Sequence, residues 1–183
     1  MPSSDPVTIP YVLKLVATLN PQSILEIGPG NGRYGFLFRE TLDFNYGRFA
    51  NWTTLIDAIE IEPDYIRALH DYIYNHIYIG DWLDIDIPRK YDLVFMGDVL
   101  EHFAEGDWQL ALRKANQYGK SVIVVSPNWE GSSSQGAWQG YQNETHLSEL
   151  SPSKVGGKCV FANSKSFICV FGDKRLMNRD VLL

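Results

Sequence analysis

The chain has 183 residues, a length that suits one domain with a sizeable hydrophobic core. Its composition, 45% hydrophobic and 21% charged, is that of an ordinary globular protein, and no apolar run approaches the ~20 residues that span a bilayer, which argues against a membrane partner. The formal net charge of -6 disfavours nucleic acid held through its phosphates.

Residues 1–22 are expected to form an N-terminal arm and a helix. The opening sequence MPSSDPVTIP has no basic and no apolar signal-peptide region, which predicts a cytoplasmic protein. Residues 1–7 are expected to be a loose arm. From Thr8 to Leu19 the apolar residues recur at helical spacing, and Pro10 is tolerated because it falls in the first turn.

A glycine-rich stretch follows, and the rest of the chain is organised around it. Ile24 to Ile27 form a short apolar run of strand type, and helical spacing returns from Tyr34 to about Leu42. Three glycines stand between them at alternate positions: Gly28, Gly30 and Gly32. Glycines allow a sharp turn and the close approach of a ligand, and a helix N-terminus offers free N–H groups. The stretch therefore predicts a nucleotide-binding turn.

The spacing of these glycines differs from the dinucleotide fingerprint. The pattern G-x-G-x-x-G would place its third glycine at position 33, where this chain has Arg33. The pattern found is E-x-G-x-G-x-G, led by Glu26. Taken alone, this triplet also fits an ordinary tight turn, so the later segments must decide between the two.

The second predicted strand runs from Thr54 to Ile61 and ends in the sequence EIEP. It follows an irregular aromatic segment at 43–52, expected to be an inserted loop that covers the core or contacts substrate. An acid at the end of this strand accepts hydrogen bonds from ribose hydroxyls in nucleotide-binding α/β folds. Glu60 and Glu62 compete for that role, and the alternative for Glu60 is a solvated acid.

The next two elements lead to another acid after a strand. The helix predicted from Pro63 to about Tyr74 carries apolar residues for the core: Tyr65, Ile66, Leu69 and Ile73. A short strand from His76 to Ile79 then ends in Gly80-Asp81-Trp82. Asp81 is either a ligand contact or an exposed acid in a plain turn.

The fourth predicted strand, Tyr91 to Met96, is nearly continuously apolar, as expected of a central parallel strand. The sequence GDVLEHF follows it. Individually, Glu101 fits a cap or a partner of Arg113 or Lys114, and His102 fits a hydrogen bond to a backbone carbonyl. A helix from Asp107 to Tyr118 and a fifth strand, Ser121 to Val125, come next in order.

The last third of the chain contains a long irregular segment and a predicted hairpin. Residues 129–152 contain aromatic side chains and are expected to form a lid on the substrate side, the alternative being a flexible surface loop. Lys158 to Phe161 and Ser166 to Phe171 predict an antiparallel hairpin. It carries the two cysteines, expected to be reduced and able to face one another. The histidines have no zinc-site spacing, so no metal is expected.

Taken in order, the segments LEIGPGNG, AIEIEP, IGDW, YDLVFMGDVLEHF and VIVVSPN resemble the class I S-adenosylmethionine-dependent methyltransferases. The resemblance spans the chain from Ile24 to Phe171. It implies an α/β fold with a doubly wound, mostly parallel seven-stranded sheet, helices on both faces and a C-terminal antiparallel hairpin, in a single domain over residues 1–183. It also implies S-adenosylmethionine as cofactor.

The resemblance assigns roles to particular residues. Glu60 rather than Glu62 would bind the ribose, and the glycine turn would pass under the methionine end of the cofactor. Asp81 would accept from the adenine amino group, with Trp82 beside it. The full set expected to bind the cofactor is Glu26, Gly28, Gly30, Gly32, Glu60, Ile61, Asp81, Trp82, Asp98 and Val99.

Methyl transfer requires alignment of acceptor and methyl group, and a base where an O- or N-acceptor must lose a proton. The candidate catalytic residues are Asp98, His102 and His146, the last from an Asn-x-x-His segment similar to one in related methyltransferases. A small-molecule or sugar-type acceptor is expected. The alternatives are a non-catalytic S-adenosylmethionine-binding protein and an NAD-dependent oxidoreductase, against which Arg33 and the predicted hairpin argue.

Overall fold

The structure is a computed structural model that describes residues 4–129, 135–137 and 139–176. The strands are β1 (Ser23–Ile27), β2 (Leu55–Glu60), β3 (His76–Ile79), β4 (Tyr91–Gly97), β5 (Gly119–Pro127), β6 (Lys158–Ala162) and β7 (Ser166–Phe171). The α-helices are α1 (Ile9–Leu19), α2 (Arg33–Leu42), α3 (Ala68–Ile73), α4 (Asp107–Tyr118) and α5 (Pro152–Val155). Short 3-10 helices include η1 (Pro6–Thr8), η2 (Phe44–Tyr46), η3 (Pro63–Tyr65), η4 (Leu100–His102) and η5 (Gln142–Glu144).

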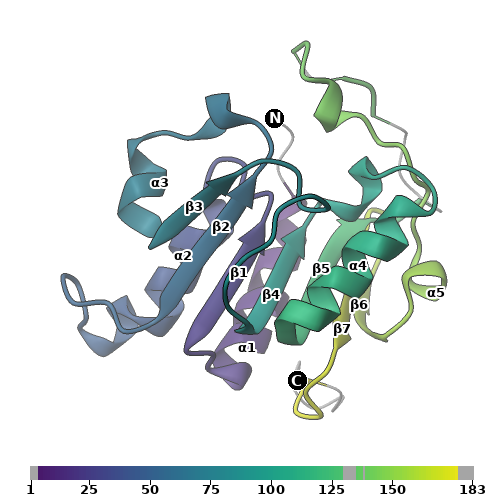
Figure 1. The fold of residues 1–183 in the computed structure, drawn as a ribbon. Coiled ribbons are helices and arrows are strands. Elements are labelled where there is room, and N and C mark those ends of the chain that lie inside the picture. The colour runs from purple at the N-terminus through teal and green to yellow at the C-terminus, as the bar shows by residue number, and fades with distance from the viewer. Residues whose placement is uncertain (1–3, 130–134, 138, 177–183) are drawn as a thin grey trace.

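The strands form one seven-stranded sheet in the order β3-β2-β1-β4-β5-β7-β6 (Figure 1). The five strands from β3 to β5 are parallel, and β7 pairs antiparallel with both β5 and β6. The order reverses between β1 and β4, the topological switch point at which open α/β sheets bind ligands. The predicted architecture is confirmed, including the C-terminal hairpin.

Helices cover both faces of the sheet. Apolar residues of α1 and α2 bury one face, since Leu15 and Phe38 pack in one cluster with Ile24 of β1. The opposite face carries α4, whose Trp108 packs in a second cluster with Leu25. Alternate residues of one strand thus feed two cores, as the two-residue period of a strand requires. Figure 1 shows α4 in front of the sheet and α1 behind it.

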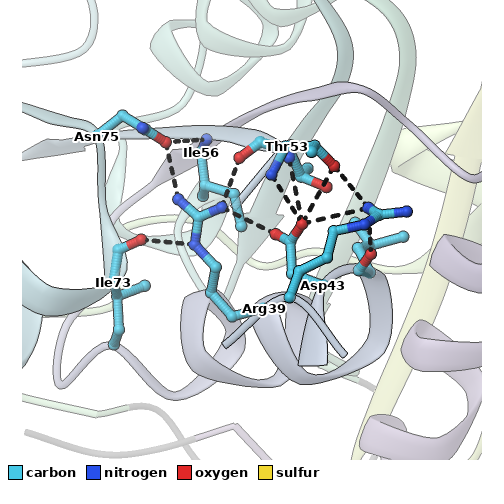
Figure 2. Close-up of polar contacts among 9 residues, drawn as sticks. Arg39, Asp43, Thr53, Ile56, Ile73 and Asn75 are labelled. Atoms are coloured by element: carbon cyan, nitrogen blue, oxygen red, sulfur yellow. Dashed lines mark hydrogen bonds and ion pairs between the residues drawn. The ribbon is translucent and has the colours of Figure 1, made fainter. Parts of the chain in front are cut away.

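A fully buried arginine joins α2 to the segments that follow it (Figure 2). Arg39 donates to the carbonyl oxygens of Ile73 (2.8 Å) and Thr54, and pairs with Asp43 at 3.1 Å. Its remaining nitrogen donates to Asn75 Oδ1 at 2.7 Å. The segment 43–52, predicted as an inserted loop, is therefore anchored on the edge of the core through Asp43.

Two local predictions need correction. The helix predicted over 63–74 is interrupted: η3 ends at Tyr65, residues 66 and 67 are extended, and α3 begins at Ala68. Leu69, expected in the core, is exposed, whereas Ile73 is buried as expected. The described part of the predicted loose arm is ordered, because Asp5 caps η1 and the Ser4 carbonyl accepts from Arg33 at 2.9 Å.

The two cysteines face one another as anticipated, Cys159 opposite Cys169 in the β6–β7 ladder, and both are free thiols. None of the described helices has the length and apolar character needed to cross a bilayer.

Candidate active site

A cavity of about 730 Å³ lies at the carboxyl ends of the parallel strands. Its lining comes from the loops after β1, β2, β3, β4 and β5 and from the start of the chain at Ser4. The lining contains nearly every residue predicted for the site: Glu26, Gly28, Gly30, Glu60, Ile61, Asp81, Trp82, Asp98, Val99, His102 and His146. Gly32 is not part of this lining.

The glycine turn is built so that its neighbours can approach. Gly28 has φ +65°, and a Cβ there would lie 2.7 Å from Cγ2 of Val99, so the motif after β1 and the motif after β4 pack directly against one another. Gly32, at φ +78°, begins α2, and its Cβ position faces Ile73 rather than the cavity. Gly32 thus shapes the helix start, where a side chain would be strained.

Glu26 lies buried beneath the turn and is held by a tyrosine. The Tyr74 hydroxyl donates to Glu26 Oε2 at 2.8 Å. Gly35 makes room for this contact, because a Cβ at Gly35 would overlap the Tyr74 hydroxyl. Burial, with a smaller contribution from the nearby Glu60, raises the pKa of Glu26 to about 8. Sequence analysis missed Tyr74 and Gly35, since their roles depend on a contact 48 residues along the chain.

Glu60, at the end of β2, closes the glycine turn from the other side. Its Oε2 accepts from the Gly30 N–H at 3.1 Å and its Oε1 accepts from the Glu62 N–H at 2.9 Å. Burial raises the pKa of Glu60 to about 7. Glu62 differs, because its carboxylate accepts from Asn143 at 2.8 Å on the exposed side. The geometry thus singles out Glu60 as the acid next to the turn.

His70, a residue with no predicted role, also supports the turn. Its Nδ1 accepts from the Arg67 N–H at 3.1 Å, which leaves the ring proton on Nε2. Nε2 therefore donates to the Gly30 carbonyl at 2.8 Å. Gly30 is consequently held at its N–H by Glu60 and at its carbonyl by His70.

The residues predicted near an adenine ring follow β3 and β2. Asp81 accepts from the Leu83 N–H at 2.8 Å, which fixes its carboxylate at the strand end. Trp82 is buried, and its indole N–H donates to the Ala111 carbonyl at 3.0 Å. Ile61 is 40% exposed and supplies an apolar side chain to the cavity.

The segment after β4 contributes Asp98, Glu101 and His102 to the lining of the cavity. Asp98 has φ +52°, and burial together with the Glu101 charge raises its pKa to about 7. Glu101 does not pair with Arg113 or Lys114: it is buried, and its Oε2 accepts from the Ser126 hydroxyl at 3.0 Å. Lys114 instead donates to backbone carbonyls, among them that of Trp82 at 2.8 Å.

The two histidines proposed as catalytic residues lie together. His102 and His146 have ring centroids 5.1 Å apart, and His102 Nδ1 lies 3.1 Å from the Thr145 carbonyl, as the sequence allowed. Burial, and then the neighbouring His102, lower the pKa of His146 to about 4. Its imidazole is therefore neutral near pH 7.

Hydrogen bonds tie the end of the predicted lid to the cavity. The Glu101 carbonyl accepts from the N–H groups of Leu147 (2.8 Å) and Ser148 (3.1 Å). Farther along the cavity rim, the Tyr65 hydroxyl donates to Glu144 at 2.8 Å. Residues 130–134 and 138 of the predicted lid lie outside the described part, and its closure over an acceptor stays a prediction.

Several solved structures are similar to this fold. The methyltransferase domain of bacterial CtHen1 is 15% identical with a TM-score of 0.60, over 90% of this chain and 96% of that one. A DhpI–SAH complex is 14% identical, with a TM-score of 0.56 over 90% and 85%. The mitomycin 7-O-methyltransferase MmcR is 15% identical, with a TM-score of 0.59 over 91% of this chain and 54% of that one.

The chain thus has the fold of the class I S-adenosylmethionine-dependent methyltransferases, as its motifs suggested. No protein-family model matches the sequence. No curated protein matches it either.

Proposed function

We propose that this cavity binds S-adenosylmethionine and that the chain transfers its methyl group to a small-molecule or sugar-type acceptor. The observation that carries the proposal is the pair of buried carboxyl groups, Glu26 and Glu60, on the two sides of the glycine turn. S-adenosylmethionine carries a sulfonium and an ammonium, and both positive charges favour ionised carboxylates at short range.

The hydrogen bonding of the glycine turn argues against a dinucleotide. The diphosphate of NAD would have to lie at the glycine turn, next to Glu60, whose carboxylate already accepts the Gly30 N–H. The Gly30 N–H is therefore already used and is not free to bind a diphosphate oxygen. Solved structures with a similar fold, such as the DhpI–SAH complex, agree with the proposed methyltransferase site.

The proposed contacts follow the loops in order. Glu60 accepts from the ribose hydroxyls, and Asp81 receives the adenine amino group, with Ile61 against the ring. The glycine turn at Gly28 and Gly30 runs under the methionine end, above Glu26. Asp98 and Val99 form the wall toward the acceptor.

The bound cofactor supplies a sulfonium-activated methyl group, and the protein supplies alignment and a path for a proton. Alignment of reacting groups is worth several kcal/mol in well-oriented systems, on the order of 7 or more. Asp98, His102 and His146 line the cavity from the segments that follow β4 and β5. They are the groups available to take a proton from an O- or N-acceptor.

Calorimetry with S-adenosylhomocysteine on two matched variants tests the cofactor site. Glu60→Ala removes an acceptor of charge-assisted hydrogen bonds, each worth about 1.5–3 kcal/mol, and should weaken binding at least about tenfold. Glu62→Ala, two residues away with its carboxylate on Asn143, should change affinity much less. The opposite ranking would contradict the assignment.

Turnover separates an enzyme from a binding protein. S-adenosylhomocysteine release is measured with S-adenosylmethionine and a panel of hydroxyl- and amine-bearing small molecules. Release that depends on the acceptor supports methyl transfer. Cofactor binding without release across the panel would favour a non-catalytic protein.

A further inference from the structure

Three side chains converge at the acceptor end of the cavity. Glu101 and His102 belong to η4 after β4, and His146 comes from the loop that follows β5. One potential ligand atom from each lies within 4.8 Å of the other two. Ligands about 2.0–2.2 Å from a shared cation are themselves up to about 4 Å apart, so small side-chain rotations would bring all three onto one ion.

Glu101 provides the strongest single observation. Glu101 lines the cavity but is only 1% exposed. Its Oε1 has no hydrogen-bond partner among the described residues. A buried carboxylate oxygen without a partner is costly. Its other oxygen is fixed by the Ser126 hydroxyl at 3.0 Å, the outer-shell support typical of a ligating carboxylate.

The histidines are arranged in the same manner. With the proton on Nδ1, His102 donates to the Thr145 carbonyl. The lone pair of Nε2 then remains for a metal ion. Metal-bound histidines usually donate their second ring N–H to such a carbonyl. The Glu101 carbonyl, by accepting from Leu147 and Ser148, fixes the backbone immediately after His146 beside η4.

We propose that Glu101, His102 and His146 form a binding site for one divalent transition-metal cation. Two imidazoles and one carboxylate suit Zn²⁺, Mn²⁺, Fe²⁺ or Co²⁺, and they leave coordination positions open. The site would replace the metal-free expectation from sequence, in which the histidines were separate candidate bases.

The open positions define a role that rests on the proposed methyl transfer. An acceptor hydroxyl bound to the cation has a lowered pKa and loses its proton to solvent or to Asp98. The acceptor oxygen then forms a bond to the methyl carbon. The bond from that carbon to the sulfonium breaks, and its electron pair stays on sulfur. The acceptor class is therefore an oxygen nucleophile that can reach the metal.

Metal titration tests the site without any methyl acceptor. Chelator-treated protein is titrated with Mn²⁺ by electron paramagnetic resonance and with Co²⁺ by visible absorption, which reports nitrogen ligation. We expect one cation per chain. His146→Ala and Glu101→Gln should each weaken binding more than about 100-fold, and Ser126→Ala about 10- to 100-fold as an outer-shell change. His76→Ala, an exposed histidine on β3, is the matched control and should bind as wild type.

Either of two outcomes would overturn the proposal: no stoichiometric cation, or binding that is unchanged in His146→Ala. Because His146 lies on a loop, that variant keeps the test valid even if Glu101→Gln fails to fold, which circular dichroism reports. S-adenosylhomocysteine affinity is measured on the same samples. If the wild-type chain binds no cation but still binds S-adenosylhomocysteine, the metal site alone is rejected, whereas absent cofactor binding rejects the proposed function alone.

Discussion

The raised pKa values of Glu26 and Glu60 predict that ligand affinity depends on pH. Burial raises their pKa values to about 8 and about 7, from an ordinary 4.5. A positively charged ligand stabilises the ionised carboxylates, so binding lowers both pKa values and releases protons. Affinity for S-adenosylmethionine should therefore rise as pH increases from about 6 to 8.

The stability of the free protein depends on pH in the opposite direction. A carboxyl group with a raised pKa in the folded state stabilises the fold below its unfolded pKa, and this contribution is lost as pH rises through the folded value. The free energy of unfolding should accordingly fall between about pH 5 and pH 8. Calorimetry at pH 6, 7 and 8, and urea unfolding across the same range, measure the two trends.

Glu60→Gln is the control for this pH dependence. It keeps the shape of the side chain and removes one of the two titrating groups, so the pH slope of affinity should become shallower. Any titration of the ligand itself is common to both proteins. An identical slope in wild type and variant would contradict the role given to Glu60.

At this scale, sequence reasoning found residues whose position relative to a strand end is diagnostic. Glu60 and the glycine turn belong to that group. Tyr74 and His70 were missed because they act through contacts with Glu26 and Gly30, distant in the chain. Nothing local to either residue encodes those contacts.

Elements are held together by specific buried polar groups as well as by the apolar cores. Arg39 connects α2 to the carbonyl that precedes β2 and to the one at the end of α3 (Figure 2). The Trp52 ring centroid lies 4.2 Å from its guanidinium carbon. Removing one partner of a buried ion pair leaves an uncompensated charge and unpaired carbonyls.

Arg39→Met should therefore lower the free energy of unfolding by about 3–5 kcal/mol, although it keeps an apolar side chain of similar length. Lys120→Ala is the comparison, because Lys120 pairs with Asp92 while its side chain is 78% exposed. Surface pairs contribute about 1 kcal/mol or less. Urea unfolding of both variants measures the difference. Equal, small effects would show that the buried network adds little to stability.

The helix boundaries show where the local sequence pattern is sufficient to predict an element. The helix over 107–118 was predicted at the bounds found, because its apolar face and its ends are encoded within the segment itself. The helix over 63–74 was predicted too long. The helical path breaks at residues 66 and 67, directly after Tyr65, whose hydroxyl donates to Glu144 from a loop 79 residues later. Such long-range contacts override local spacing.

For the whole molecule, the order of motifs predicted the class of sheet. Strand, glycine turn and helix, followed by acids after successive strands, place every candidate residue at one edge, since parallel strands end on the same side. The pairing of His146 with His102 and Glu101 was not predictable, because a long loop brings them together. Figure 1 shows the described residues 139–151 of this loop beside the carboxyl ends of the strands.

The central claim is that this edge of the sheet binds S-adenosylmethionine rather than a dinucleotide. Calorimetric titration of the wild-type chain with S-adenosylhomocysteine and, separately, with NAD tests it most directly. We expect one S-adenosylhomocysteine per chain and no measurable heat from NAD at the same concentration. Binding of NAD with equal or greater affinity, or no binding of S-adenosylhomocysteine, would contradict it.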